Sequence, residues 1–582
     1  MDRSGADHID ELTGLSESAR SLCRWLDERD WDFRAAAAER GVEPAALYRE
    51  WLEQLGWNQS LAARVYRQPR TRRRVTRQAI EAQMKTFGVI RRPDIGRALK
   101  GQKLEGGLSA MREVNEFVAG ASSRERLCCE QLLELARTQQ QLRHHDRARA
   151  ALVEVVELAR SIGAPELVAR AIHPFTYSVF QTSRFGSYDA EEIHQLDDWI
   201  ALLREEGEVK PLALCLAHLG FRLFVSPSRK ERARGKEASR EALELAERSG
   251  DRTTLALTKS MWTLSSSGPR RLEERIALLA PEVERAGEVE TDTRYVVFHS
   301  ALNDLFEAAR FEEAEAIASQ LHGLERSCTA PWPERYRVAL AVFRGQWEEA
   351  RRLSVLRPGV PVDSSAQVLG LLQCETLELR GEWHELESLA RWTSTQNPRV
   401  PMHRIALARA LTLGGDPERV REEFEGWARD DFAAVPRDFV MIANLCQLAE
   451  VCHALGDRQN AATLYDLLSP YRERMIVVRV MAAVRGPVAH ALALLAVTLG
   501  DAATARADFE IALGRAQDGR SPPHVARVST DFARLLAGSS SPKDRAYASQ
   551  LATQASKQAA SVQMGWLVRR ADALRAELAE PA

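Results

Sequence analysis

The sequence is poor in lysine and in paired cysteines. Of its 80 basic residues, 9 are lysine and 71 are arginine, a bias that says little about function. No two of the eight cysteines form a Cys-x-x-Cys pair, so the chain carries no paired-thiol motif. Most of the cysteines stand among apolar residues typical of helices, and this pattern indicates buried, reduced thiols.

The features of export and of membrane insertion are also missing. The first residues, MDRSGADHIDEL, are acidic and polar and lack the basic and apolar regions of a signal peptide. No apolar run reaches the about 18 residues that a membrane-spanning helix needs. We therefore expect a cytoplasmic protein without a membrane partner.

Motifs for nucleotide chemistry and for common catalytic centres are absent. The pair Gly235–Lys236 is followed by glutamate, where a phosphate-binding loop has serine or threonine, and no glycine stands five residues before it. The stretch His384–Glu385 lacks the second histidine of a zinc-protease helix. We read His144–Asp146 (HHD) as an exposed turn of a helix hairpin rather than a metal site. We predict that the protein is not an enzyme and has neither a cofactor nor a metal site.

Charge is concentrated in one segment of a nearly neutral chain, whose formal net charge is −2. Residues 1–57 hold 7 basic and 13 acidic side chains, a net charge of −6, whereas residues 58–103 hold 13 basic and 2 acidic, a net charge of +11. The remainder, residues 104–582, holds 60 basic and 67 acidic side chains, a net charge of −7. The nearly neutral total therefore hides one concentrated basic segment.

Beyond about residue 107 the sequence alternates between amphipathic helices and short turns. A unit recurs in which glycine is followed five residues later by a small apolar residue and often four residues after that by an aromatic one. GDRQNAATLY (Gly456, Ala461, Tyr465) and GDAATARADF (Gly500, Ala505, Phe509) are the clearest copies. Less regular copies begin at Ala309, Gly345, Gly381 and Gly415, and RHHDRARAAL from Arg143 fits loosely.

The copies that begin at residues 309, 345, 381, 415, 456 and 500 are spaced by 36, 36, 34, 41 and 44 residues. These spacings approach the period of about 34 residues of the tetratricopeptide repeat. Glycine ends the first helix of each pair because a left-handed conformation costs it little, and the small residue lets the two helices approach. We predict an all-α fold, a right-handed superhelix of degenerate tetratricopeptide-like helix hairpins over residues 106–582.

Residues 430–537 resemble the C-terminal helical region of large bacterial signalling ATPases and ATPase-linked nucleotide cyclases or regulators. The stretches DDFAAVPRDFVMIANLCQLAEVCHALGDRQNAATLYDLLSPYRERMIVV and RGPVAHALALLAVTLGDAATARADFEIAL carry this resemblance. In that family the region follows an ATPase module and senses or binds partners. Since this chain lacks the ATPase motifs, the resemblance implies a sensing scaffold without nucleotide chemistry.

Residues 31–57 (WDFRAAAAERGVEPAALYREWLEQLGW) precede the helical array and resemble a Fis-type helix-turn-helix. The pattern predicts a helix that ends at Gly41, a turn, and a second helix from Pro44 that buries Leu47, Trp51, Leu52 and Leu55. The resemblance implies that Ala37 permits the close helix crossing and that the second helix enters the major groove. That helix carries Glu43, Glu50 and Glu53 against Arg49 alone, and this surface would repel phosphate.

The following segment repeats this layout more loosely and has the opposite charge. Its stretch YRQPRTRRRVTRQ, residues 66–78, holds six arginines and no acid. If a helix begins after Pro69, Arg70, Arg74 and Arg77 share one face, and Ile80, Met84 and Phe87 form a second stripe that faces a core. The candidate nucleic-acid-binding residues are Arg67, Arg70, Arg72, Arg73, Arg74, Arg77, Lys85, Arg91 and Arg92.

The basic segment has several explanations at this point: contact with DNA, docking of an acidic protein, pairing with the acidic array of the same chain, or a solvated helix face. We expect a tail over residues 1–15, a helix-turn-helix-like unit over 16–57, a basic helical unit over 58–105 and the array over 106–582. The first hypothesis is a bacterial transcription regulator whose head binds DNA and whose array receives a protein or peptide signal on its concave face. The alternative is a non-enzymatic interaction scaffold or accessory subunit whose basic helix docks an acidic partner.

Overall fold

The structure is a computed structural model. It describes residues 17–29, 31–55, 121–142, 144–182, 190–226, 228–266, 268, 271–330, 334–354, 362–396, 398, 400–478 and 483–579. The chain divides into two compact units, Met1–Glu116 and Phe117–Ala582. None of the helices in the described ranges is both long and apolar enough to cross a bilayer.

Three helices are described in the first unit: α2 (Glu17–Asp27), α3 (Phe33–Arg40) and α4 (Pro44–Gln54). Helix α4 contacts both α2 and α3. The predicted core positions Leu47, Trp51, Leu52 and Leu55 are all buried, which confirms that part of the helix-turn-helix pattern.

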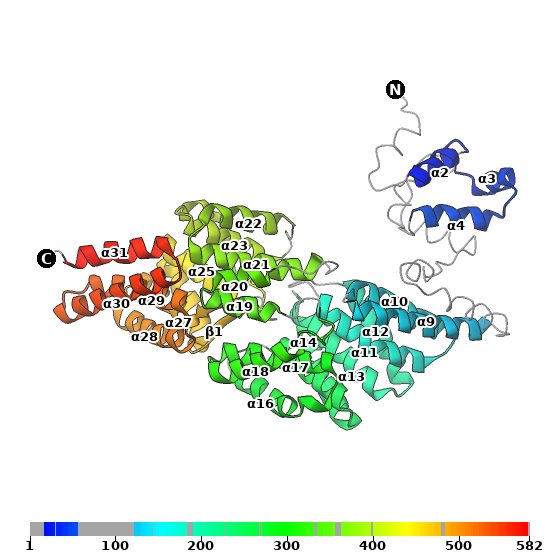
Figure 1. Ribbon diagram of the computed structural model, residues 1–582, viewed down its shortest axis with the longest axis horizontal. Coiled ribbons are helices and arrows are strands. Elements are labelled where there is room, and N and C mark those ends of the chain that lie inside the picture. The colour runs from blue at the N-terminus through cyan, green and yellow to red at the C-terminus, as the bar shows by residue number, and fades with distance from the viewer. Residues whose placement is uncertain are drawn as a thin grey trace. The chain divides into compact units, whose positions relative to one another are not determined.

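The described part of the second unit is almost entirely helical, as Figure 1 shows. It begins with α9 (Ala121–Gln141), α10 (His145–Ser161), α11 (Pro165–Thr182), α12 (Ala190–Glu205), α13 (Val209–Phe224), α14 (Arg229–Ser249), α15 (Arg252–Ser265) and α16 (Arg271–Glu284). It continues with α17 (Thr291–Glu307), α18 (Phe311–Leu324), α19 (Arg335–Phe343), α20 (Trp347–Leu353), α21 (Val362–Arg380), α22 (Trp383–Gln396), α23 (Pro401–Leu413) and α24 (Arg421–Phe432). It ends with α25 (Met441–Leu455), α26 (Arg458–Leu468), α27 (Val488–Leu499), α28 (Ala502–Asp518), α29 (Pro522–Ala537), α30 (Pro542–Ser561) and α31 (Gly565–Ala579). Short 3₁₀ turns lie at Ala286–Glu288, Pro417–Val420 and Ser469–Tyr471.

Successive helices pack as hairpins, and the hairpins stack in chain order. Pairs such as α9 with α10, α17 with α18 and α27 with α28 are in contact, and α13, α15 and α17 also contact one another in sequence. Each unit of such an array packs mainly on its neighbours. The expected all-α helical-repeat fold is confirmed, and the right-handed sense of the superhelix stays a prediction.

The turns of the hairpins have the conformation expected from the repeat pattern. Gly456 and Gly500 end α25 and α27 with φ angles of 65° and 76°. Glycine adopts this left-handed region at little cost. The residues that begin the four less regular repeat copies also adopt the left-handed conformation: Ala309, Gly345, Gly381 and Gly415.

The small and aromatic positions of the repeat also do what the pattern predicts. Ala461 and Ala505 are fully buried, and so is Phe509. The hydroxyl of Tyr465 on α26 donates to the carboxylate of Asp508 on α28 over 2.9 Å and so connects one hairpin to the next.

A β-hairpin interrupts the helices, and the sequence pattern did not predict it. Strands β1 (Met475–Val478) and β2 (Ala483–Pro487) pair antiparallel, with Val477 opposite Val484. The four residues of β1 are all buried. A run of four apolar residues is too short for its period to separate strand from buried helix. The packing of the hairpin between helices decides that this run forms a strand. Strand β1 contacts α17 and α25, and β2 contacts α19 and α21.

Helices far apart in the sequence close on one another in the C-terminal part of the array. The indole of Trp347 on α20 donates to the carbonyl of Val562 over 2.6 Å. The indole of Trp566 on α31 donates to the carbonyl of Leu379 over 3.0 Å. At Gly381 a Cβ atom would lie 2.3 Å from the Trp566 ring, so glycine is required there for the approach as well as for the turn.

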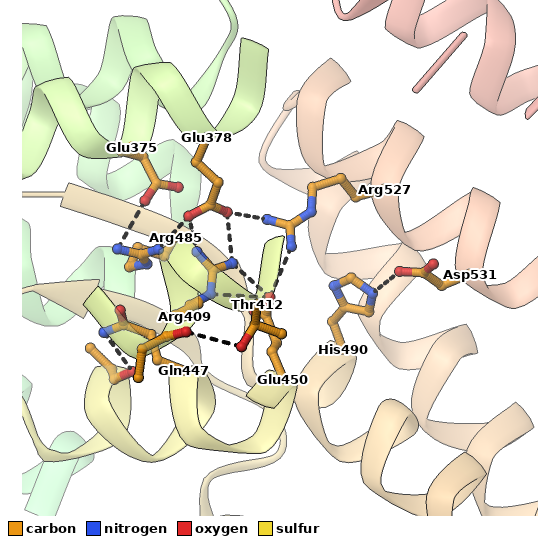
Figure 2. Close-up of polar contacts among 12 residues, drawn as sticks. Glu375, Glu378, Arg409, Thr412, Gln447, Glu450, Arg485, His490, Arg527 and Asp531 are labelled. Atoms are coloured by element: carbon orange, nitrogen blue, oxygen red, sulfur yellow. Dashed lines mark hydrogen bonds and ion pairs between the residues drawn. The ribbon is translucent and has the colours of Figure 1, made fainter. Parts of the chain in front are cut away.

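A network of buried and partly buried ion pairs joins α21, α23, α25, α29 and β2 (Figure 2). Arg409 on α23 donates to Glu378 on α21 over 2.7 Å and to Glu450 on α25 over 2.6 Å. Arg527 on α29 reaches the same two carboxylates over 2.8 and 3.2 Å. Arg485 on β2 donates to Glu378 over 2.7 Å.

With Glu375, which lies 3.1 Å from Arg485, the network holds three arginines and three glutamates. Burial alone would favour the protonated acid, but Arg409 and Arg527 outweigh it and lower the pKa of Glu450 to about 2. Burial also lowers the pKa of Arg409 to about 10. Arg409 and Glu450 are therefore both charged at neutral pH, and each carboxylate of the network is paired with an arginine.

Replacing Arg409 with methionine should destabilise the protein strongly. The variant keeps most of the side-chain volume but leaves Glu378 and Glu450 with too little positive charge in a buried site. Breaking a buried pair on one side costs about 3–5 kcal/mol. The measurement is the shift of the denaturant midpoint.

Arg421→Ala removes an exposed pair with Glu418 and serves as the control, with an expected change in the free energy of unfolding below about 0.5 kcal/mol. Equal shifts for the two variants would contradict the role assigned to the network.

A pH dependence follows from Asp438, which is buried just before α25 and accepts a hydrogen bond from the Val440 backbone N–H over 3.0 Å. Burial raises the pKa of Asp438 from 3.8 to about 7. Because the folded state binds this proton more tightly than the unfolded state, the contribution of Asp438 to stability falls as pH rises between these two values.

Asp438→Asn keeps the acceptor and removes the ionisation. The melting temperature of the variant, relative to that of the unmodified protein, should therefore be higher at pH 8 than at pH 4. Asp572→Asn changes an exposed carboxylate and should show no such difference. If Asp438→Asn changes the melting temperature by the same amount at pH 4 and at pH 8, the assignment of the pH dependence to Asp438 is contradicted.

Candidate functional site

The nine basic residues predicted to bind nucleic acid lie outside the described residues. They are Arg67, Arg70, Arg72, Arg73, Arg74, Arg77, Lys85, Arg91 and Arg92, and the stripe of Ile80, Met84 and Phe87 lies outside as well. Their role stays a prediction.

Helices α3 and α4 form the helix-turn-helix arrangement that the sequence predicted. The side chain of Asp32 accepts from the backbone of Arg34 and Ala35 and so begins α3. Gly41 ends α3 with a φ angle of 67°, and Pro44 occupies the first turn of α4, where its missing N–H costs nothing. Ala37 is fully buried, in keeping with the close crossing expected of it.

Aromatic side chains hold this unit together. The rings of Phe33 and Tyr48 meet edge to face with centroids 4.7 Å apart, and those of Trp31 and Trp51 with centroids 5.7 Å apart. The indole N–H of Trp31 donates to Asp27 over 2.7 Å, which satisfies its buried polar atom. These four rings pack together with smaller apolar side chains, among them Leu22 and Leu26 of α2, in one core.

The exposed side of α4 is acidic. Glu50 and Glu53 are exposed, and Arg40 from α3 pairs with Glu50 over 3.1 Å. Arg40 and Arg29 also lie over the ring of Trp25, each 4.3 Å from its centroid. These two arginines are thus engaged within the unit.

The array contains a groove of about 600 Å³ between three helices that are not all neighbours in sequence. Helices α9 and α11 form two of its sides, and the start of α17 forms the third. The lining that matters for its chemistry consists of Glu134, Arg137, Arg170, His173, Glu290 and Asp292.

A set of hydrogen bonds around Thr329 fixes the width of this groove. One ring nitrogen of His145, at the start of α10, lies 2.8 Å from the Thr329 carbonyl oxygen. The carboxylate of Asp292 accepts from the Thr329 backbone N–H over 2.6 Å and from its hydroxyl over 2.8 Å. These contacts join the first hairpins to the segment after α18.

The interpretation of the HHD stretch as an exposed turn was wrong for His145, which is fully buried. The contact that buries it lies 184 residues away, at Thr329, and has no local signal in the sequence. Within the described ranges, no group of three or more metal-binding side chains is placed to hold an ion.

The charges of the groove are only partly paired. Arg170 binds Glu130 over 2.8 Å, and Arg137 lies 3.3 Å from Glu134. Glu290 forms no ion pair within the described part of the chain, and its side chain is exposed. An excess of carboxylate is left at the α17 side of the groove.

Two polar groups on α11 are left without their usual partners. The Nε2 atom of His173 is buried and has no hydrogen-bond partner among the described residues. Burial lowers the pKa of His173, and the negative charges of Glu290, Asp251 and Asp292 oppose this effect. Pro174 lies inside α11 and has no N–H to donate to the carbonyl of Arg170.

The sequence patterns did not predict this groove. The one usable signal is Pro174 within the helical run AIHPFTYSVF, since a proline inside a helix frees a carbonyl. The expectation of buried thiols is confirmed for six of the eight cysteines, with Cys128 and Cys374 partly exposed. Gly235–Lys236 lies inside α14.

No protein-family model matches the chain, and no curated protein matches it. One similar solved structure is described as a circular tandem repeat protein with novel repeat topology and enhanced subunit contact surfaces. It shares 16% sequence identity, with 96% of each chain covered and a TM-score of 0.13. At this TM-score the likeness carries no argument.

Asp292→Ala should loosen the segment around Thr329. The variant removes the acceptor of two hydrogen bonds, and bonds to a charged group contribute about 1.5–3 kcal/mol each. Hydrogen exchange at the Thr329 amide should become at least about tenfold faster. Glu290→Ala removes a nearby carboxylate that does not bind Thr329 and should leave this rate unchanged; a similar rate in both variants would refute the assignment.

Proposed function

We propose that this protein is a DNA-binding transcription regulator whose head contacts the duplex and whose helical array binds a polypeptide that conveys a signal. The observation that carries the proposal is the net charge of +11 over residues 58–103, which directly follow a helix-turn-helix arrangement. Neutralisation of phosphate by basic side chains dominates most DNA affinity.

The contacts are assigned to the basic segment rather than to α4. Helix α4 exposes Glu50 and Glu53, and carboxylates on a DNA-facing surface repel phosphate. The arginines from Arg67 to Arg77, with Lys85, Arg91 and Arg92, supply the positive charge. The α3–α4 unit then serves as the folded support of the segment that follows it.

A second function, an interaction scaffold without DNA, is favoured by two observations. The described surface of the head is acidic on α4, and the array has a groove with partly unpaired polar groups. In this case the basic segment docks an acidic protein. Binding of that protein would survive nuclease treatment and would require the same arginines.

Salt titration of duplex binding by the full chain tests the first function. About six phosphate contacts should weaken binding by roughly a thousandfold between 50 and 200 mM salt. Replacing Arg70, Arg72, Arg73, Arg74 and Arg77 with alanine should abolish most of the binding and flatten the salt dependence.

The matched control replaces five exposed arginines of the array that form surface pairs: Arg240, Arg351, Arg352, Arg421 and Arg575. It changes the net charge by the same amount and should bind DNA as the unmodified chain does. If duplex binding is absent at 50 mM salt, or if both variants weaken it equally, the proposal fails.

A further inference from the structure

We infer that the groove between α9, α11 and α17 binds the guanidinium group of an arginine side chain carried by an extended polypeptide. This inference rests on the proposed role of the array in binding a polypeptide. It does not depend on DNA binding by the head. It states where the ligand binds, in the groove, and that the bound group is positively charged.

The first argument is the charge that the groove leaves unpaired. Its two arginines, Arg137 and Arg170, are engaged by Glu134 and Glu130. Glu290 forms no ion pair within the described ranges, and Asp292 binds only the neutral groups of Thr329. An anionic ligand would therefore meet uncompensated carboxylates, whereas a cation would be attracted to them.

The second argument is the surplus of hydrogen-bond acceptors. The carbonyl of Arg170 lacks the donor that Pro174 would supply if it were another residue. The Nε2 atom of His173 has no hydrogen-bond partner among the described residues and can accept a hydrogen bond when the ring proton is on Nδ1. Glu290 and Asp292 add carboxylate oxygens. A guanidinium group carries five N–H donors and no acceptor, which is the complement of this lining.

The third argument concerns the shape of the ligand. Leu133, Ala169 and Pro174 give the groove apolar wall, against which the aliphatic stem of a long basic side chain can pack. A planar guanidinium engages carboxylates with two parallel hydrogen bonds, whereas a lysine ammonium acts as a point charge. We therefore expect arginine to bind more tightly than lysine.

The partial positive charge at the N-terminal end of α17 opposes the binding of a cation in the groove and limits the expected affinity. Glu290 and Asp292 lie at that end, where a helix already favours negative charge. Their attraction for a cation is thus reduced but not cancelled, since a helix end amounts to about half a unit charge against two carboxylates. The expected affinity is modest and depends on salt.

The test uses the full chain and two fluorescein-labelled nonapeptides. One alternates arginine with serine, and the other has citrulline in place of each arginine, which removes the charge and keeps the shape. Fluorescence anisotropy at 50 mM salt should give a Kd for the arginine peptide at least about tenfold lower than for the citrulline peptide. Glu290→Gln should raise the Kd of the arginine peptide about fivefold.

Glu284→Gln is the matched control, because it removes the same charge from an exposed position on α16 that does not line the groove. It should leave the Kd unchanged. Equal binding of the two peptides, no binding of the arginine peptide at millimolar concentration, or equal effects of Glu290→Gln and Glu284→Gln would overturn the inference.

The outcome is separable from the test of DNA binding. If the arginine peptide does not bind while the duplex still binds through residues 70–77, only the assignment of the groove is contradicted. If the peptide binds as expected while the duplex does not, the groove assignment stands and the DNA-binding half of the proposed function falls.

Discussion

Six charged side chains packed between helices, three of them buried and three partly buried, connect the elements of the C-terminal part of this chain. Removing charge from water is costly, and the cost is offset only where each partner is in place. Glu378 meets this condition with arginines from α23, β2 and α29, and the Arg527–Glu378 contact spans 149 residues. A shift of any of these elements would leave a buried charge without its partner, so the network fixes their register.

This arrangement has a consequence for ligand binding. Side chains of the chain itself occupy the space between α21, α23, α25, β2 and α29 (Figure 2). The groove between α9, α11 and α17 differs because its carboxylates are only partly paired. The buried network therefore stabilises one part of the array, and the groove inferred to bind a ligand lies in another part.

Local features of the fold could be predicted from the sequence, and contacts between distant residues could not. Gly456 and Gly500 mark helix ends because glycine adopts the left-handed conformation at little cost. The core of the α3–α4 unit follows from the spacing of Leu47, Trp51, Leu52 and Leu55. By contrast, the β1–β2 hairpin, the buried state of His145 and the groove itself depend on neighbours more than a hundred residues away, which no local pattern encodes.

The central claim is that the basic segment, rather than α4 or the array, contacts DNA. Ultraviolet cross-linking of the full chain to a duplex that carries photoreactive bases, followed by mass spectrometry of the cross-linked peptides, tests it directly. The account predicts cross-links within residues 58–103 and none within 121–579. Cross-links concentrated on the exposed side of α4 or on the array would contradict it.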